Sequence, residues 1–157
     1  MPCDTEETDE FAGLIRDINT MPGYLVRQCS QLSREFFAEE CKSYGITPEQ
    51  LIVLITLQQN PGIGQVVVAE RVSLDQATTG QIIARLIKHG LARRKKNPAD
   101  TRAWQVELTD DGAKLLDEVR PHSSRAKDRF LEPLDTEERN QLLRLMRKLI
   151  DRPEKPA

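Results

Sequence analysis

The chain has 157 residues and a net charge of −2, and it is 38% hydrophobic and 31% charged. This length is that of one ordinary domain with a core of its own, which excludes a large multidomain assembly. Only 4% of the residues are aromatic, which argues against an RNA-binding platform built on stacked bases.

The first long segment is predicted to be a helix with two apolar faces. From Tyr24 to Tyr44, apolar side chains recur at helical spacing along two stripes, one through Leu25 and Phe36 and the other through Phe37. A helix that is apolar along two stripes needs more than one packing partner. We expect one partner to be the chain's own core and the other to be a second subunit or a ligand cavity.

Three helix starts and a tight turn follow. Thr47-Pro48-Glu49-Gln50 has an N-cap, a proline at the first helical position and a glutamine that completes a capping box. A short helix over residues 65–71 is followed by the turn Val72-Ser73-Leu74 and by a second helix that Asp75 caps and that reaches Lys88. This spacing predicts a helix-turn-helix.

After this helix, the spacing of the apolar residues changes from helical to strand-like. Residues 91–96 and 103–108 have strand-like patterns, and residues 97–102 between them are rich in turn formers, so we predict a hairpin. Thr109 or Asp110 is expected to cap a long helix. Asp135-Thr136-Glu137-Glu138 is a capping box that opens the C-terminal helix.

These elements define the expected organisation of the chain. The fold class is mainly α with a small β wing. A winged helix-turn-helix is predicted over residues 47–109, between helical dimerisation segments at 10–46 and 110–151. The polar ends, residues 1–9 and 152–157, are expected to be disordered.

Charge is segregated along the chain. Between Arg71 and Trp104 there are eight lysines and arginines and two aspartates, a net charge of +6 that leaves −8 on the remainder. A basic stretch on an otherwise acidic protein is typical of a nucleic-acid-binding surface.

The residues expected to contact DNA lie in the second helix and the hairpin. Short polar side chains at a helix N-terminus can approach base edges in the major groove. Arg102 follows Asp100 at the hairpin tip, and an arginine oriented by a carboxylate can enter a narrow minor groove. The candidate DNA-binding residues are Gln76, Thr78, Thr79, Gln81, Arg85, Arg94, Lys96, Asp100 and Arg102.

Several motifs resemble the core of the MarR family. They are Ala69-Glu70-Arg71-Val72, the run from Leu86 to Gly90-Leu91, Asp100-Thr101-Arg102, and Leu108-Thr109-Asp110-Asp111-Gly112. The resemblance extends over nearly the whole chain. It implies a homodimer intertwined through its terminal helices, with recognition helices and wings on a pseudopalindromic operator of double-stranded DNA. Gly80 and Gln81 depart from many relatives, which carry Ser or Thr and Arg or Lys there.

The resemblance also implies a small-molecule effector. Regulators of this kind are commonly released from DNA by a phenolic or aromatic acid, and the opening Pro22–Gln28 is similar to members that govern aromatic-acid catabolism. The function implied is therefore a repressor released by an aromatic acid or its CoA thioester, with Arg27 pairing with the carboxylate. The candidate effector-binding residues are Arg27, Ser30, Ser33, Arg34, Phe37 and Tyr44, which could equally be ordinary core, interface and surface residues.

A redox sensor is the alternative hypothesis. Cys29 and Cys41 lie on the first long helix about 18 Å apart along its axis, so they cannot bridge within one helix. Cys29 lies on an apolar stripe, where we expect a buried and inert thiol. The third cysteine, Cys3, lies near the N-terminus.

Other classes of function have less support. His89 and His122 are far apart and no cysteine or histidine cluster has metal-ligand spacing, so neither a metal nor another cofactor is expected. We find no nucleophile motif or phosphate loop, so an enzyme is not expected. A dimeric adaptor for proteins alone remains as an alternative that DNA binding would exclude. Three cysteines without a CxxC, no signal segment and no long apolar run predict a cytoplasmic protein without a membrane anchor.

Overall fold

A computed structural model of the chain describes residues 17–151, apart from the side chains of residues 101 and 102. Its elements are α1 (Pro22–Cys41), α2 (Pro48–Gln59), β1 (Ile63–Gly64), α3 (Gln65–Val72), α4 (Gln76–Lys88), β2 (Ala92–Asn97), β3 (Asp100–Leu108), α5 (Asp110–Phe130) and α6 (Thr136–Ile150), with short 3-10 helices at Ile18–Thr20 and Lys42–Tyr44. A mainly helical chain with one small sheet confirms the predicted fold class. The expected disordered ends, residues 1–9 and 152–157, lie outside the described residues.

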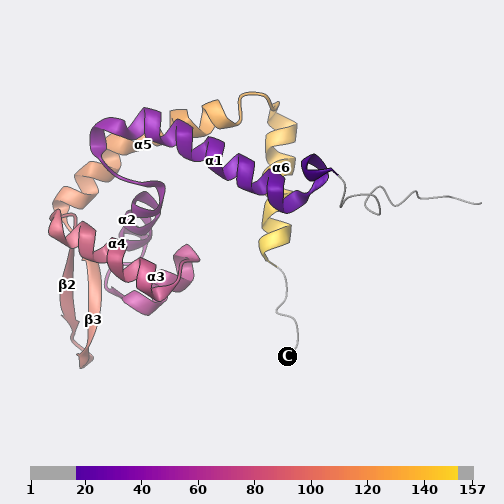
Figure 1. Cartoon of the computed structure of the whole chain (residues 1–157). Helices are drawn as coiled ribbons and strands as arrows, with labels where there is room; N and C mark the ends of the chain where they lie inside the picture. The colour runs from indigo at the N-terminus through magenta and orange to yellow at the C-terminus, as the bar shows by residue number, and fades with distance from the viewer. Residues whose placement is uncertain (1–16, 152–157) are drawn as a thin grey trace, which may run out of the picture.

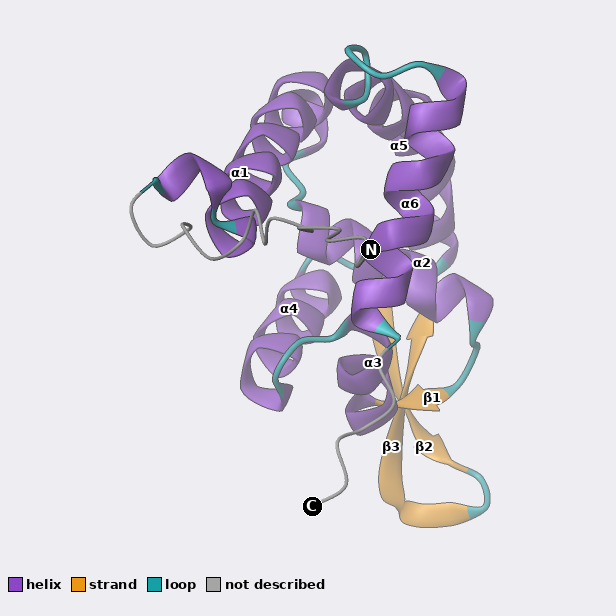
Figure 2. Cartoon of the chain, turned by 90° about the vertical axis from the view of Figure 1, so that its right-hand side faces the viewer, coloured by secondary structure: helices purple, strands orange, loops and turns teal. Residues whose placement is uncertain are grey.

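The helices form an upper layer and a lower lobe (Figure 1). α1 and α5 pack side by side in the upper layer, while α2, α3 and α4 lie beneath them. The hairpin of β2 and β3 extends downward from the lower lobe, away from α1 and α5, as Figure 2 also shows. The hairpin and α4 are therefore presented on the side of the molecule opposite the upper layer.

The helices begin where the sequence predicts. At four of these starts an N-cap side chain accepts a backbone N–H left free in the first turn, which is the physical reason such residues begin helices. The N-caps are Thr47 for α2, Asp75 for α4, Thr109 for α5 and Asp135 for α6. The capping boxes predicted for α2 and α6 are both present.

The hairpin is longer than predicted. β3 begins at Asp100, so the turn consists of Pro98 and Ala99 instead of residues 97–102. Asn97 pairs with Asp100 across the turn, and its side-chain Oδ1 accepts the backbone N–H of Ala99 at 2.9 Å. This side-chain bond closes a tight turn where composition alone indicated a loose one.

The sheet also has a strand that the sequence did not reveal. β1 pairs antiparallel with β3, with Ile63 opposite Val106, in the order β1-β3-β2. Two residues are too few to show an alternating pattern. β1 joins the segment before α3 to the base of the hairpin, which holds the wing against the helices.

One continuous core connects the two layers. It joins side chains of α1, α2, α3, α4, the sheet and α5, and these are Phe37, Cys41, Leu51, Val53, Leu54, Leu57, Val68, Ile83, Leu86, Ala92, Val106, Leu116, Val119 and Ala126. This cluster crosses the predicted boundaries between 10–46, 47–109 and 110–151. That division into regions therefore stays a prediction.

A glycine sets the junction of the hairpin with α5. A Cβ on Gly112 would lie 2.2 Å from the carbonyl oxygen of Leu91, so no other residue fits without moving the helix. The backbone N–H of Gly112 donates to Thr109 Oγ1 at 3.1 Å, and that hydroxyl donates to the carbonyl oxygen of Gly90 at 2.6 Å. This close approach explains the spacing of the Leu-Thr-x-x-Gly motif.

The C-terminal helix has no buried residue within one chain. Its apolar side chains face the N-terminal half of α1 across a groove with a cavity volume of about 550 Å³. The groove includes Leu25, Val26, Cys29, Leu142, Leu145 and Met146. Leu25 and Val26, at the N-terminal ends of the two stripes of α1, are therefore left uncovered by their own chain, whereas Phe37 and Cys41 near the C-terminal end of α1 belong to the core.

Candidate nucleic-acid interface

α3 and α4 meet through a tight turn. Ser73 ends α3 with φ of 54°, a left-handed conformation that is uncommon for a residue other than glycine. The backbone N–H of Leu74 donates to the carbonyl oxygen of Ala69 at 3.1 Å, which caps the end of α3. The chain then enters α4 at Asp75, in the predicted helix-turn-helix arrangement.

The N-terminus of α4 is held by Asp75. Its carboxylate accepts the hydroxyl of Thr78 at 2.6 Å and the backbone N–H of Thr78 at 2.7 Å. These two hydrogen bonds hold the pKa of Asp75 below its ordinary value. The hydroxyl of Thr78 is therefore committed to the cap, and its side chain is half-buried.

α4 presents a polar outer face. Gln76, Gln81 and Arg85 are exposed, in agreement with their predicted role as contacts to DNA, which stays a prediction. The prediction for Thr79 is wrong. Its side chain is fully buried, and its hydroxyl donates to the carbonyl oxygen of Asp75 at 2.9 Å. At helical spacing, Thr79 faces the core with Ile83.

The cations of β2 divide between the two faces of the hairpin. Arg93 donates to Glu107 at 3.1 Å, and Lys95 lies 3.5 Å from the same carboxylate. On the other face, Arg94 donates to the side-chain Oε1 of Gln65 at 3.5 Å, and Nζ of Lys96 lies 6.0 Å from the centre of the Trp104 ring. The two predicted contacts on β2, Arg94 and Lys96, thus share the face that looks toward α3.

The hairpin tip contains the other two predicted contacts. Asp100 is exposed and begins β3. The backbone of Arg102 continues that strand, and its side chain lies outside the described part of the structure. The pairing of these residues with DNA stays a prediction.

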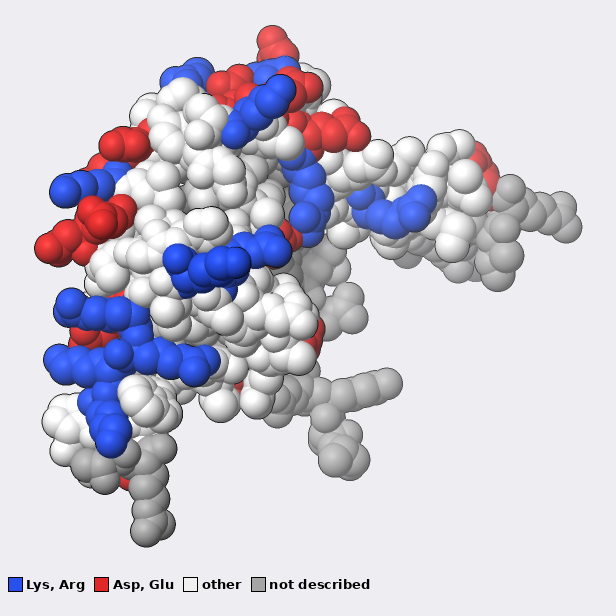
Figure 3. All heavy atoms as spheres, turned by 60° about the vertical axis from the view of Figure 1, so that its left-hand side comes forward, with Lys and Arg blue, Asp and Glu red and all other residues white. Residues whose placement is uncertain are grey.

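These side chains form a basic surface. In Figure 3, lysines and arginines gather over the lower lobe and the base of the hairpin, and most of the visible acidic side chains lie above them. The segregation of charge along the sequence therefore becomes a segregation between parts of the folded molecule. A surface of this kind attracts the phosphates of a nucleic acid.

The candidate effector residues do not meet in one cavity. Ser30 and Ser33 line the apolar groove between α1 and α6. Arg27 is exposed and its guanidinium lies 5.9 Å from the centre of the Tyr24 ring. Arg34 is paired with Glu49.

The other two candidates take part in packing within the chain. Phe37 belongs to the core, and the Tyr44 ring meets the His122 ring edge to face with centroids 5.1 Å apart. The predicted grouping of six residues around one effector is therefore not seen in the single chain. An assembled site would need a contribution from a second chain or a different conformation.

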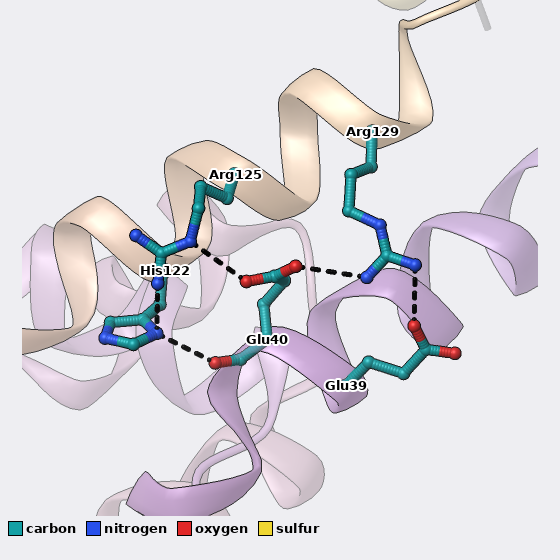
Figure 4. A network of polar contacts seen from close by, with 5 residues as sticks. All are labelled: Glu39, Glu40, His122, Arg125 and Arg129. Carbon is teal, nitrogen blue, oxygen red and sulfur yellow. Dashed lines mark hydrogen bonds and ion pairs between the residues drawn. The ribbon is translucent and has the colours of Figure 1, made fainter.

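A polar network between α1 and α5 was not predicted (Figure 4). Glu40 accepts from Arg125 and Arg129, each at 3.1 Å, and Glu39 accepts from Arg129 at 2.7 Å. Arg129 also lies over the Phe36 ring at 4.5 Å. No sequence signal links residues that are more than 80 positions apart, although Arg125 and Arg129 have the i, i+4 spacing that places both on one face of α5.

The histidine of this network has two competing contacts. Nδ1 of His122 lies 3.0 Å from the carbonyl oxygen of Glu40 and 2.6 Å from Nη2 of Arg125. In the neutral ring, Nδ1 can donate to the carbonyl or accept from the guanidinium, but one nitrogen does not do both at once. This network ties the C-terminal end of α1 to the C-terminal half of α5.

We expect the Glu40 carboxylate to make stability depend on pH. Its hydrogen bond with Arg125, with a further one from Arg129, holds its pKa below the ordinary 4.5. Because the pKa of Glu40 is lower in the folded protein than in the unfolded chain, its carboxylate stabilises the folded state above pH 4.5. This stabilisation is lost as the pH falls through the pKa of Glu40 in the folded protein. Glu40→Gln should therefore be less stable than the wild type at neutral pH, and the difference should narrow below pH 4.5.

Urea unfolding at several pH values measures this difference. Glu39→Gln is the matched control, because Glu39 is more exposed and has a single arginine partner. A constant difference between the wild type and Glu40→Gln at every pH would show that the charge of Glu40 does not stabilise the contact of α1 with α5.

Cys29 is more exposed than predicted, whereas Cys41 is buried. Cys29 is exposed in the single chain and lines the apolar groove, so the expectation that it is buried is wrong for one chain alone. Cys41 is buried, and desolvation together with the charge of Glu40 raises the pKa of its thiol. A raised pKa lowers the thiolate fraction on which redox sensing depends.

The described residues contain no group of three or more histidine, cysteine, aspartate or glutamate side chains arranged to hold a metal ion. None of their helices has the length and apolar character needed to cross a membrane.

A helix-turn-helix whose second helix exposes a polar face, followed by a basic hairpin paired to the same core, defines a winged-helix DNA-binding protein. Residues 46–104 match the model of the MarR family. The HTH-type transcriptional repressor NicR of Pseudomonas putida is 30% identical over 135 residues, which cover 86% of this chain and 85% of NicR. The chain belongs to the MarR family and is a DNA-binding transcription regulator, not an enzyme.

Solved structures are similar over most of the chain. BpsR of Bordetella bronchiseptica, whose DNA binding is regulated by 6-hydroxynicotinic acid, has a TM-score of 0.81 and 29% identity, with 85% of this chain and 95% of BpsR covered. The repressor CouR bound to a 23-mer DNA duplex has a TM-score of 0.81 and 25% identity, with 87% of this chain and 97% of CouR covered.

Proposed function

We propose that this protein is a homodimeric repressor that binds a pseudopalindromic operator and leaves it when a small aromatic acid, or its CoA thioester, binds. The observation that carries the proposal is the basic surface formed by the outer face of α4 and the hairpin. Gln76, Gln81 and Arg85 would enter the major groove. Arg94, Lys96 and the hairpin tip would follow the backbone into the minor groove.

The apolar groove between α1 and α6 supports the dimer. Several large apolar side chains of these helices are 43% to 75% exposed in one chain, among them Leu25, Leu145 and Ile150. Apolar side chains gathered in a groove of this size mark an interaction site on a soluble protein. A second copy that inserts its own terminal helices would cover them and place two α4 helices on one face of the dimer.

The likeness to BpsR supports an aromatic acid as the effector, since 6-hydroxynicotinic acid regulates DNA binding of that protein. Arg27 is exposed on α1, close to Ser30, which lines the groove. A guanidinium can pair with a carboxylate, and the ring of the acid would pack beside Ser30, at a part of the groove that the second copy leaves open. A ligand bound there would contact the helices that set the distance between the two DNA-binding lobes.

The first experiment is selection of a DNA duplex by the wild-type protein from a random-sequence pool. Fluorescence anisotropy should then show salt-dependent binding to the selected duplex and weak binding to a scrambled one of equal length. An equal affinity for both duplexes would exclude sequence-specific regulation.

Arg27→Ala tests the effector site. A screen of aromatic acids for a rise in melting temperature identifies a compound that binds the folded protein. We expect Arg27→Ala to bind the selected duplex with wild-type affinity, and to need at least about tenfold more compound for release, because one charge-assisted hydrogen bond is lost. Lys42→Ala, which removes an exposed cation beyond the other end of α1, is the control. Release of Arg27→Ala at the wild-type concentration would remove Arg27 from the site.

A further inference from the structure

The chain contains one tryptophan, and it lies on the hairpin. Trp104 is 53% exposed, although a ring of this size is usually largely covered in a folded protein. It pairs with Lys96 across the hairpin, and Nζ of Lys96 lies 6.0 Å from the ring centre, within the range of a cation–π contact. The ring therefore remains open to a partner while the lysine limits its orientation.

The ring lies on the side of the hairpin that looks toward the helices. Along β3, Trp104 shares a face with the buried Val106, because side chains alternate along a strand. Arg94 is opposite Val106 and reaches Gln65 at the start of α3. The amide of Gln65 lies in turn against Gly80 of α4, where an added Cβ would come within 2.9 Å of it. Trp104 thus lies on the same side of the hairpin as α4.

The same face carries the cations of β2 that lack an acidic partner. Arg93 and Lys95, on the opposite face, are paired with Glu107. Neither Arg94 nor Lys96 has a carboxylate partner among the described residues. Positions two apart on a strand are about 6.6 Å apart, which is on the order of the spacing of successive phosphates in one DNA strand.

We propose that Trp104 packs against the deoxyribose of the DNA backbone beside the wing, while Arg94 and Lys96 contact the phosphates on either side of that sugar. A DNA strand alternates an apolar sugar with an anionic phosphate, and this face of the hairpin places the exposed Trp104 ring opposite Lys96 and diagonally from Arg94, two cations without an acidic partner in the described part of the chain. The contact adds affinity without reading a base, because every nucleotide has the same sugar. The inference rests on the DNA-binding function proposed above.

Two measurements on the selected duplex test the proposal. One is the fluorescence emission of Trp104, and the other is the affinity of the wild type, Trp104→Ala, Trp104→Phe and Lys96→Ala. The emission of the wild type should shift or be quenched when the duplex is added, and no other tryptophan can cause the change. Trp104→Ala should weaken binding about tenfold, as tryptophans central to an interface commonly do. Trp104→Phe should recover most of the affinity, because a flat ring remains.

Salt dependence separates an apolar contact from a charge effect. Trp104→Ala should leave the slope of log affinity against log salt unchanged, whereas Lys96→Ala should reduce the slope by about one phosphate contact. Unchanged tryptophan emission at saturating duplex, or wild-type affinity of Trp104→Ala, would overturn the proposal while DNA binding stands. A wild-type protein that selects no duplex would instead overturn the DNA-binding function itself.

Discussion

Met146→Asp is expected to convert the dimer into a monomer and to weaken operator binding more than about 100-fold. Met146 lines the groove between α1 and α6 and is 43% exposed in one chain. If a second copy covers the groove, the substitution places an unpaired carboxylate in an apolar interface twice per dimer. Each such charge costs about 3 kcal/mol or more. A monomer then contacts a single half-site, and the gain from binding two half-sites together is lost.

Light scattering measures the mass, and anisotropy on the selected duplex measures the affinity. Asn140→Asp is the matched control, since it adds the same charge to an exposed position of α6 outside the groove. It should remain dimeric and bind DNA. A dimeric Met146→Asp with wild-type affinity would show that the dimer does not use this groove.

Arg102→Ala is expected to weaken specific binding by about 1–3 kcal/mol, roughly 5- to 150-fold. An arginine in the minor groove both neutralises phosphate charge and responds to groove width, so its loss should also reduce the salt slope by about one. Asp100→Ala should weaken binding less, because the cation remains and loses only an orienting group.

Anisotropy at several salt concentrations measures both effects, with thermal melts as the folding control. The melting temperatures of both variants should stay close to that of the wild type, since a surface ion pair contributes about 0–1 kcal/mol to stability. If Arg102→Ala binds as the wild type does at every salt concentration, the hairpin tip does not contact DNA. Trp104 would then have to be tested as a contact independent of the tip.

Local chemistry made much of the fold predictable. A capping side chain satisfies backbone groups within three residues of itself, so Thr47, Asp75, Thr109 and Asp135 could be recognised from their neighbours in sequence. The order of helix, turn, helix and hairpin then followed, together with the basic character of the segment. The exposure of Gln76, Gln81 and Arg85 agrees with the site predicted from it.

Predictions that depended on neighbours distant in sequence were less successful. Thr78 and Thr79 look equivalent at the start of α4, yet Thr79 points into the core and Thr78 is committed to the cap. The strand β1 becomes visible only through its pairing with β3. Cys29 lies on an apolar stripe, but its own chain leaves the N-terminal part of that stripe uncovered.

The sequence by itself determined where the helices begin, the class of the DNA-binding unit and the segment that carries its charge, because each follows from interactions among residues close together in the chain. Only the tertiary structure decided that Thr79 lies in the core, how Arg94 and Trp104 come to share one face, and how α1 is tied to α5. The bond between Glu40 and His122 joins residues 82 positions apart. The burial of a side chain and its long-range hydrogen-bond partners depend on which helices and strands pack together. The sequence of one helix or strand does not contain that information.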